Sequence, residues 1–342
     1  MNADKQPEAR VMISIVIPAH NRPAYLLEAV KSITEQNYHN FEVVVIDDGS
    51  TPAIEKAPLQ AMLGEHLKLI RHNKGLGIPK AKNAGIKAAS GEVILLLDDD
   101  DLLSPDALHT IGTSFTEQPE LDCIFMGVEP FGPYAANPKK NRETAINKIL
   151  SRLNPEENNG LYHFSSELFY ELLHSVPIDF QRPAARRGTW NIVGRFDENA
   201  PYSESTWAIR AATMCTVALT KKPLNLWRIH DSNFGWPEGK SPHQIKTGQI
   251  DVAITTANQL LTDTLKQRQN INTRIKALKH QRAEFLFAKA FYLRDKDWLE
   301  GLKSLSAAFF VKPQPVHLKL AVKYLIAPQM TTKTNKQKST LP

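Results

Sequence analysis

The chain is organised around the stretch Glu92-Val-Ile-Leu-Leu-Leu-Asp-Asp-Asp-Asp101, in which an uninterrupted apolar run leads directly into four consecutive aspartates. Such a run is typical of a strand that is buried on both faces of a parallel sheet. Ligands bind at the carboxyl ends of strands in open parallel α/β sheets, and hard carboxylate oxygens suit Mg²⁺ or Mn²⁺. Adjacent carboxylates repel one another, so we expect a cationic partner. The alternative is a solvated acidic turn before the next helix.

The composition is that of an ordinary globular protein, with 342 residues of which 42% are hydrophobic and 23% charged. This length favours two domains, or one α/β domain with a long appendage. The net charge of +6 favours anionic partners, but the basic residues are spread along the chain, so no nucleic acid is expected. Residues 1–10 lack the apolar segment of a signal peptide, and no stretch approaches the roughly 18 apolar residues of a membrane span. We therefore expect a cytoplasmic protein.

Strand-like and helix-like segments alternate over the first 128 residues. Apolar runs predict strands at 11–18, 41–46, 67–71 and 121–128, in addition to the opening stretch. Helical spacing predicts helices after Pro23 and at 79–89, and Ser104-Pro105-Asp106 is typical of a helix start. This alternation indicates βαβ units in an α/β fold, with a Rossmann-like, mostly parallel sheet and flanking helices.

The pattern changes after residue 128. Residues 129–138 are rich in Pro, Gly and Asn and predict an exposed connection, and residues 177–187 predict an irregular segment. Helices are expected at 145–153, 167–174, 207–218, 245–291, 298–310 and 316–326, and a strand at 224–230.

Polar residues follow three of the predicted strands: Pro18-Ala-His-Asn-Arg22, Asp47-Asp-Gly-Ser50 and Asp98–Asp101. The carboxyl ends of strands in a doubly wound sheet can converge on one crevice. There Asp47 could accept the N3–H of a uracil-type base, Asp98 could reach a ribose hydroxyl and Asp100 could hold a metal on a diphosphate. This arrangement predicts a nucleotide-diphosphate site without a G-x-G-x-x-G motif or a P-loop.

Four motifs together resemble the family 2 glycosyltransferases of the GT-A fold. They are Ser14-Ile-Val-Ile-Pro-Ala-His-Asn-Arg22, Val43-Val-Val-Ile-Asp-Asp-Gly-Ser50, Ala81-Lys-Asn-Ala-Gly85 and Leu97-Asp-Asp-Asp-Asp101, in that order along the chain. The resemblance implies an inverting enzyme that moves a sugar from a nucleotide diphosphate sugar, expected to be UDP-linked, to a hydroxyl of a glycan or glycolipid. It also implies Mg²⁺ or Mn²⁺ as cofactor.

The resemblance assigns roles to individual residues. Asp98 and Asp100 would form a D-x-D pair, with Asp100 as the direct metal ligand and Asp47 reading the base. Lys82 and Asn83 would border the nucleotide pocket. The remaining donor-binding candidates are Pro18, His20, Asn21, Arg22, Arg71 and Asp99.

Inverting transfer needs a general base within about 3 Å of the proton that it removes from the acceptor hydroxyl. The family usually supplies it from a Glu-Asp pair at the start of a helix, and alignment on Arg210 places Ser203 and Glu204 there. The resemblance thus implies Glu204 as the catalytic base, with Asp197 as the alternative. His230 stands where a family histidine reaches the metal or the diphosphate.

A further group of residues is expected at the acceptor or the diphosphate. Arg182, Arg186 and Arg187 could neutralise a leaving diphosphate through bidentate contacts, or could form a solvated basic loop. Trp190 and Trp207 could stack on an acceptor sugar, or could pack in the interior.

We expect a nucleotide-sugar-binding half at 10–128, an acceptor-binding half at 129–240, a helical extension at 241–330 and a disordered basic tail at 331–342. The helix at 316–326 and the basic tail could make peripheral contact with an anionic membrane, or the helix could pack on the domain.

Two functions from other classes remain as alternatives. A nucleotidyltransferase that makes sugar nucleotides would carry a Gly- and Arg-rich first loop, which Pro18-Ala-His-Asn-Arg22 lacks. A non-catalytic sugar-nucleotide-binding relative is suggested only by the altered Ser203-Glu204 pair.

Overall fold

The computed structural model describes residues 11–198 and 203–230, and positions between 283 and 322 that include one continuous helix, α11 (Trp298–Val311). The chain divides into two compact units, Met1–Asn233 and Phe234–Pro342. The first unit contains the sheet and all the candidate site residues.

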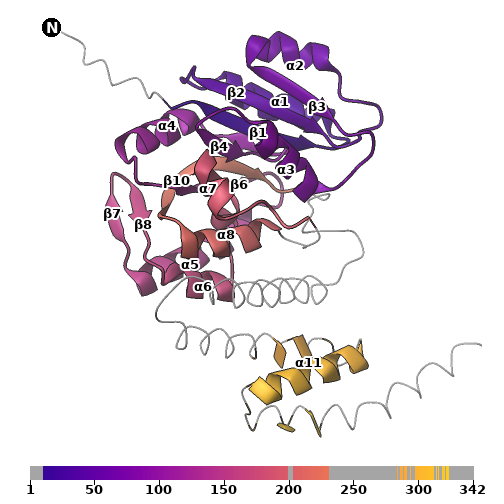
Figure 1. The fold of residues 1–342 in the computed structure, drawn as a ribbon, viewed down its shortest axis with the longest axis vertical. Helices are drawn as coiled ribbons and strands as arrows, with labels where there is room; N and C mark the ends of the chain where they lie inside the picture. The colour runs from indigo at the N-terminus through magenta and orange to yellow at the C-terminus, as the bar shows by residue number, and fades with distance from the viewer. Residues whose placement is uncertain are drawn as a thin grey trace, which may run out of the picture. The chain divides into compact units, whose positions relative to one another are not determined.

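A ten-stranded sheet runs through the first unit (Figure 1), in the order β3-β2-β1-β4-β9-β6-β10-β8-β7, with β5 paired to β10. β1 to β4 are mutually parallel, and β6 is parallel to β10, whereas β9 is antiparallel to both of its neighbours. The predicted α/β fold with a mostly parallel sheet is confirmed. The strands are β1 (Ile13–Ala19), β2 (Phe41–Asp47), β3 (Leu67–Arg71), β4 (Val93–Leu96), β5 (Leu102–Leu103), β6 (Cys123–Phe131), β7 (Glu156–Asn158), β8 (Leu161–His163), β9 (Pro183–Arg186) and β10 (Val217–Arg228).

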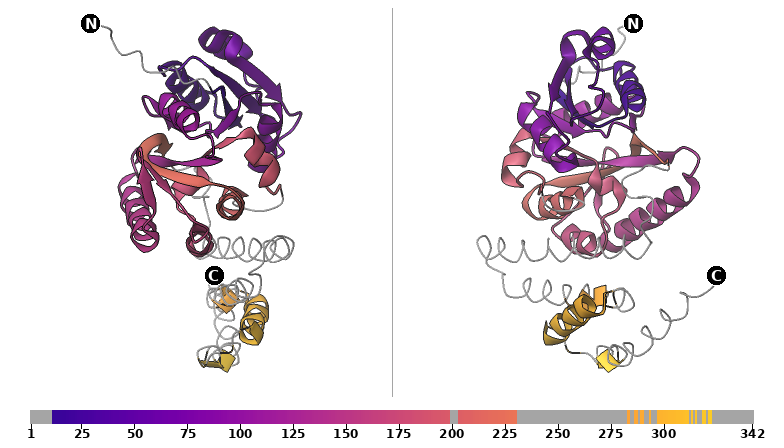
Figure 2. Two further views of the ribbon diagram at one scale, coloured as in Figure 1. Left: turned by 60° about the vertical axis from the view of Figure 1, so that its left-hand side comes forward. Right: turned by 90° about the vertical axis from the view of Figure 1, so that its right-hand side faces the viewer.

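Helices cover both faces of this sheet (Figure 2). Alternate residues of β1, β2 and β4 pack with α1, α2 and α4 in one core, and α3 packs against β1 and β2 through the opposite set. Because helices cover both faces of the sheet, the side chains on both faces of these strands are buried, which explains their unbroken apolar sequences. The helices of the unit are α1 (Pro23–Thr34), α2 (Lys56–Leu63), α3 (Ile78–Ala88), α4 (Ala107–Glu117), α5 (Ala136–Leu153), α6 (Leu168–His174), α7 (Arg187–Ile192) and α8 (Ser203–Met214), with short 3₁₀ turns η1 (Gly64–His66) and η2 (Ile178–Gln181).

The close contact between α3 and the sheet depends on Gly85. A Cβ atom at this position would overlap Cγ1 of Val16 and would lie 3.3 Å from Cγ1 of Ile46. The glycine of the Ala81-Lys-Asn-Ala-Gly85 motif therefore lets the helix approach β1, and it fixes where the neighbouring Lys82 and Asn83 lie.

The prediction of an irregular segment at 177–187 is wrong. This segment contains η2 and β9, and β9 pairs with β4 on one side and β6 on the other. Pro-Ala-Ala-Arg has no apolar run of its own, so we attribute its strand conformation to pairing with β4 and β6, which lie on either side of it.

Three predicted helix starts and one strand start are also wrong. The helix predicted at 207–218 is α8, which begins at Ser203 and ends at Met214, and the strand predicted at 224–230 is β10, which already begins at Val217. α4 begins at Ala107 rather than near Ser104, because Asp106 adopts a left-handed conformation with φ of 62°. α5 begins at Ala136, inside the stretch predicted to be an exposed connection, and it runs to Leu153.

In the second unit, α11 confirms the helix predicted at 298–310. The predictions for 245–291, for the helix at 316–326 and for the basic tail lie wholly or largely outside the described residues. Within the part of the chain that is described, no helix combines the length and the apolar character needed to cross a bilayer.

Candidate active site

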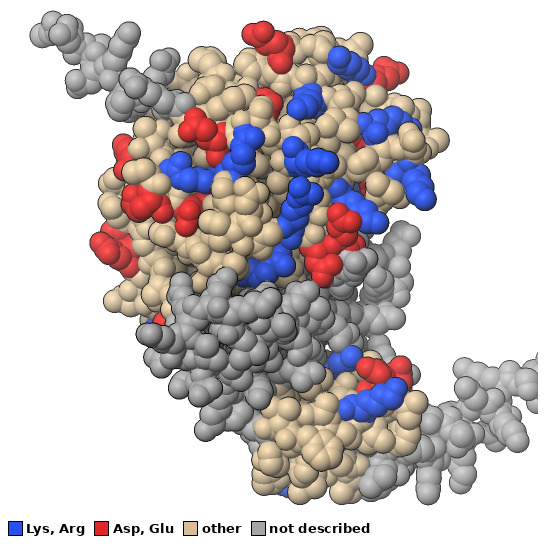
Figure 3. Space-filling view, viewed as in Figure 1, with Lys and Arg blue, Asp and Glu red and all other residues tan. Residues whose placement is uncertain are grey.

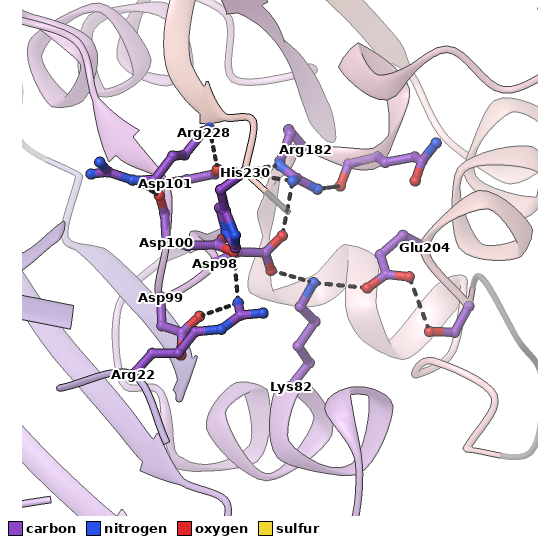
Figure 4. Close-up of polar contacts among 12 residues, drawn as sticks. Arg22, Lys82, Asp98, Asp99, Asp100, Asp101, Arg182, Glu204, Arg228 and His230 are labelled. Carbon is purple, nitrogen blue, oxygen red and sulfur yellow. Dashed lines mark hydrogen bonds and ion pairs between the residues drawn. The ribbon is translucent and has the colours of Figure 1, made fainter. Parts of the chain in front are cut away.

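The polar ends of several strands meet at one edge of the sheet (Figure 4). Ala19 of β1 lies beside Asp47 of β2, which lies beside Arg71 of β3. β9 runs in the opposite direction, so Arg182, just before its first residue, lies at this same edge. The structure thus brings together the strand ends that the sequence singles out, and adds the end of β10 at Arg228.

Asp98 and Asp101 share a buried cation, Arg182. The Nη2 of Arg182 lies 2.8 Å from Asp98 Oδ2 and 3.1 Å from Asp101 Oδ2. Asp98 also accepts from Lys82 Nζ at 2.8 Å, and Asp101 accepts from the backbone N–H of Arg228 at 3.0 Å. Protein side chains therefore supply the counter-charge that four adjacent aspartates require.

Asp99 and Asp100 face the loop that follows β1. Arg22 Nη1 lies 3.3 Å from Asp99 Oδ1 and 2.6 Å from Asp100 Oδ2. The backbone N–H of His20 donates to Asp99 at 3.2 Å, and His230 Nε2 lies 3.0 Å from Asp100 Oδ2. Asp100 thus contacts two distant segments of the chain, the loop after β1 through Arg22 and the end of β10 through His230.

The surroundings of these aspartates drive their pKa values apart. Burial alone would raise the pKa of Asp98, but the charges of Arg182 and Lys82 hold it well below its usual range. Burial and the neighbouring Asp100 raise the pKa of Asp99 to about 7. Burial, opposed by Arg182, raises the pKa of Asp101 to about 7. Chemically identical carboxyl groups therefore have different pKa values, as expected where charged groups share a buried site.

Glu204, in the first turn of α8, meets Lys82 from α3. Lys82 Nζ lies 2.7 Å from Glu204 Oε1, and the Ser203 hydroxyl donates to Oε2 at 3.3 Å. Burial raises the pKa of Glu204, but the charge and hydrogen bond of Lys82 outweigh it and leave that pKa below its ordinary value. The implied base is therefore an ionised carboxylate beside the aspartates.

Asn83 holds the backbone of a neighbouring segment. Its Nδ2 donates to the carbonyl of Phe196 at 2.9 Å, and its Oδ1 accepts from the N–H of Phe196 at 3.0 Å. Nδ2 also contacts Glu198 Oε1 at 3.1 Å. Asn83 therefore acts in this structure as a structural clamp, and its amide is occupied by protein groups.

Asp47 is almost completely buried, with 1% of its surface exposed. Its carboxylate accepts from the N–H groups of Ser50 at 2.8 Å and Ile54 at 3.2 Å, and forms an ion pair with Arg71. Burial raises the pKa of Asp47, but these hydrogen bonds from Ser50, Ile54 and Arg71 lower it below its usual value. Asp47 and Arg71 are brought together, and here they fix the loop after β2.

His20 and Asn21 connect the loops after β1 and β2. His20 Nδ1 lies 2.8 Å from the carbonyl oxygen of Asp48, and Asn21 Nδ2 lies 2.9 Å from His20 Nε2. The Asn21 backbone donates to Ser50 Oγ at 3.0 Å, and its side chain accepts from the N–H of Thr51 at 2.8 Å. Pro18 is buried within β1 itself.

Arg186 and Arg187 are not at this edge of the sheet, which contradicts their assignment to the diphosphate. Arg186 pairs with Val93 at the amino end of β4, opposite the aspartates. The carbonyl oxygens of Leu121 and Phe115 accept from its guanidinium at 2.8 and 2.7 Å. The guanidinium of Arg187 donates to the carbonyl of Gly91. Both arginines are structural because they satisfy backbone carbonyls.

Trp190 and Trp207 are buried, with 3% and 0% of their surfaces exposed. Their rings stack with centroids 4.4 Å apart, and Phe196 packs on Trp190 at 5.5 Å. The proposed stacking on an acceptor sugar is therefore wrong for both residues, and the alternative of packing in the interior is confirmed, with the Trp190 ring of α7 stacked on the Trp207 ring of α8.

Arg228 is a site residue to which the sequence assigned no role. Its guanidinium carbon lies 4.7 Å from the ring centroids of both Tyr25 and Phe131. Its Nε donates to the carbonyl of Asp100 at 2.8 Å, and its Nη2 reaches Glu28 at 2.6 Å. The sequence signal that could have identified Arg228 is its position two residues before His230.

Asp48 is a second residue without an assigned role. Its carboxylate accepts from the N–H groups of Leu76 at 2.9 Å and Gly77 at 2.8 Å, and lies 2.7 Å from His72 Nδ1. It thereby fixes the turn that leads into α3. A second aspartate after β2 was the only sequence signal for this role.

The donor atoms around Asp100 fit a divalent metal that shares its coordination with a substrate. Mg²⁺ is usually held by one or two carboxylates together with substrate phosphates, and Asp100 and His230 already approach each other to 3.0 Å. Among the described residues, no three or more His, Cys, Asp or Glu side chains form a group that could hold an ion unaided. A metal here would therefore need oxygens from a ligand.

Comparisons with known proteins identify the class to which this sheet and its acidic strand end belong. The model of the glycosyl transferase family 2 matches residues 14–202, so the chain belongs to this family. The expected family and fold are confirmed, and the chain spans about a sixth to a half of the length of the curated relatives that it matches.

Similar proteins include glycosyltransferase GlyG of Streptococcus pneumoniae, 37% identical over 29% of this chain and 34% of GlyG. Among solved structures, S. aureus TarS 1-349 in complex with UDP-GlcNAc is 15% identical, with a TM-score of 0.62 over 92% of this chain and 88% of that one. A mannosyltransferase from Pyrobaculum calidifontis in complex with GDP-Man and Mn²⁺ is 17% identical, with a TM-score of 0.50 over 96% of this chain and 84% of that one.

Proposed function

We propose that this protein transfers a sugar, with inversion, from a nucleotide diphosphate sugar to a hydroxyl of a glycan or a lipid-linked acceptor. One observation carries the proposal: Lys82 bridges Asp98, at the ligand-binding end of β4, and Glu204, at the start of α8. The carboxylate at the donor-binding edge and the proposed base thus lie on either side of one amine, so the base is close to the place where the acceptor hydroxyl would attack the donor sugar.

The donor is proposed to be UDP-linked. Family membership and the complexes of TarS with UDP-GlcNAc and with UDP support a uridine nucleotide. The base would lie near Asp47 and Arg71, and the ribose near Asp98. In the structure Asp47 is paired with Arg71, so reading of the base by Asp47 requires that pair to open.

In the proposed reaction, the acceptor hydroxyl oxygen attacks C1 of the donor sugar from the face opposite the diphosphate. Glu204 takes the hydroxyl proton, a new C–O bond forms, and the bond between C1 and the diphosphate oxygen breaks with its electron pair leaving on the diphosphate. Arg22 and Arg182 lie among the aspartates at this end of the sheet, where their charges would offset that leaving group.

The proposed cofactor is Mg²⁺ or Mn²⁺, which Asp98, Asp100 and His230 would hold together with diphosphate oxygens. Once bound, the ion would supply Lewis-acid stabilisation to the departing diphosphate. The mannosyltransferase complex with GDP-Man and Mn²⁺ supports this choice by fold alone. Arg22 and His230 now contact Asp100, so metal binding would rearrange this pair of contacts.

The proposal is tested by measuring release of free nucleoside diphosphate from a panel of UDP-, GDP- and dTDP-sugars, with Mn²⁺, in the presence of candidate glycan acceptors. We expect release from a UDP-sugar that depends on the acceptor. A thermal-shift screen of the same donors shows binding separately, because a bound ligand raises the melting temperature by mass action. Donor binding without release by any acceptor would indicate a non-catalytic relative.

The nucleotidyltransferase alternative has a different product. Such an enzyme would release pyrophosphate from a nucleoside triphosphate and a sugar phosphate. The membership in glycosyl transferase family 2 favours the glycosyl transfer reaction.

A further inference from the structure

Lys82 is the buried cation that connects the two halves of the proposed reaction. Only 2% of its surface is exposed, and its Nζ lies 2.8 Å from Asp98 Oδ1 and 2.7 Å from Glu204 Oε1. The two carboxylates come from segments more than a hundred residues apart in the chain. Both distances are those of strong, charge-assisted hydrogen bonds.

The position of Lys82 is fixed by its own helix. Gly85, one turn later, allows α3 to pack directly against Val16 of β1. Asn83, the next residue, clamps the backbone of Phe196 with hydrogen bonds in both directions. The backbone of Lys82 is therefore held in place, and the burial of its side chain restricts the movement of its amine.

The charge of Lys82 acts on Glu204 with little screening by solvent. The Glu204 side chain is 15% exposed, and burial of a carboxylate disfavours its charged form. Asp98 disfavours it further, whereas Lys82 favours it through charge and a hydrogen bond. Arg182 faces the same cluster from the start of β9 and also interacts with Glu204, and the Ser203 hydroxyl donates to Oε2.

We propose that Lys82 is a positioning residue for the transfer reaction: it holds Glu204 beside the donor site and keeps its carboxylate ionised, so that the second oxygen is available to the acceptor hydroxyl. The inference rests on the proposed function. It gives the lysine of the Ala81-Lys-Asn-Ala-Gly85 motif a role toward the base, in addition to bordering the nucleotide. Lys82 acts through Glu204 and Asp98.

The first test is a direct titration that needs no substrate. Selective ¹³C labelling of glutamate carboxyls, with the Glu204 signal assigned from Glu204→Gln, measures the pKa of Glu204 by NMR. We expect wild-type Glu204 to titrate below the ordinary value of about 4.3. In Lys82→Met the pKa should rise by about one to three units, and in Lys82→Arg, which keeps the charge, it should stay low.

The matched control is Lys87→Met, an exposed lysine on the same helix, which should leave the Glu204 titration unchanged. A Glu204 pKa at or above about 4.3 in the wild type, or an equal pKa in wild type and Lys82→Met, overturns the proposal. If Lys82→Met does not fold, the wild-type titration and Lys82→Arg still decide it, because a pKa at or above the ordinary value in either would contradict the role.

The second test uses the pH profile of kcat with donor and acceptor saturating. In the wild type, kcat should fall only at low pH, with an apparent pKa equal to that of Glu204. In Lys82→Met this apparent pKa should rise by the same amount as the pKa measured by NMR. The KM for the donor should change much less than kcat. A lysine with a purely structural role would lower kcat equally at every pH. If the wild type transfers sugar from no donor, the proposed function fails, and the NMR titration still decides the role of Lys82 toward Glu204.

Discussion

Glu204 has one carboxylate oxygen on Lys82 and the other near the Ser203 hydroxyl. Replacement by Gln keeps the shape of the side chain but removes its ability to accept a proton. We expect Glu204→Gln to lower kcat by about 100- to 10,000-fold, while the dissociation constant of the donor, measured by calorimetry, changes little. Glu117→Gln, at an exposed position in α4, is the control. Near-normal turnover in Glu204→Gln would show that another group is the base.

Asp100 lies where the proposed metal site, Arg22 and His230 meet. We expect Asp100→Ala to lower metal-dependent transfer by about 100- to 1,000-fold, because the carboxylate that would bind the ion is removed. The check is the transfer rate as a function of Mn²⁺ concentration, with a chelator added as the metal-free reference. Asp106→Asn is the matched control, since Asn tolerates the left-handed backbone at that exposed position. An unchanged metal response in Asp100→Ala would contradict the ligand assignment.

At the scale of single residues, motif order was sufficient to place several side chains at one edge of the sheet. Asp98, Asp100 and Glu204 were singled out from the sequence, and the structure brings them to one site. The partner of each side chain was not predictable, because Arg182 and Arg186 look alike in the sequence. One neutralises buried aspartates and the other binds backbone carbonyls, a difference set by which edge of the sheet each one reaches.

At the scale of elements, α3 can be tested through its close approach to the sheet. We expect Gly85→Ala to lower the free energy of unfolding by about 1–3 kcal/mol, because the added methyl group overlaps Val16. Turnover should fall as well, because the helix carries Lys82. Urea denaturation gives the stability change. Gly188→Ala is the control, because a Cβ there meets no atom within 4 Å. Equal free energies of unfolding for Gly85→Ala and the wild type would mean that α3 can move away from β1 without loss of stability.

The elements of the first half were predictable because their signals are local. β1, β2, β3 and β4 are apolar runs that are buried on both faces or end at turn residues, and their bounds differ from the predictions by only a few residues. β9 was not predictable from Pro-Ala-Ala-Arg, because its strand conformation comes from pairing with distant strands. Tertiary context overrides local propensity at such a short strand inside a sheet.

At the scale of the whole molecule, the sequence-based hypothesis of membrane contact concerns the predicted helix at 316–326 and the basic tail. On the face drawn in Figure 3, Lys and Arg side chains lie down the middle and on the right of the first unit, and acidic side chains lie on its left, at its top and at its lower right. We expect full-length protein to co-sediment with anionic liposomes more than a version that ends at Pro313, and salt to weaken this binding. Equal binding of the two versions would contradict the hypothesis.

The place of β9 in the middle of the sheet also governs the order in which the chain can fold during its synthesis. β4 and β6 leave the ribosome early, but the strand that joins them is more than fifty residues further along the chain than β6. Until it arrives, each of those strands has an open edge, and open edges are templates for pairing with other chains. A nascent chain therefore cannot connect β4 to β6 until translation has passed Arg186, and products truncated before that point expose both of these edges to aggregation.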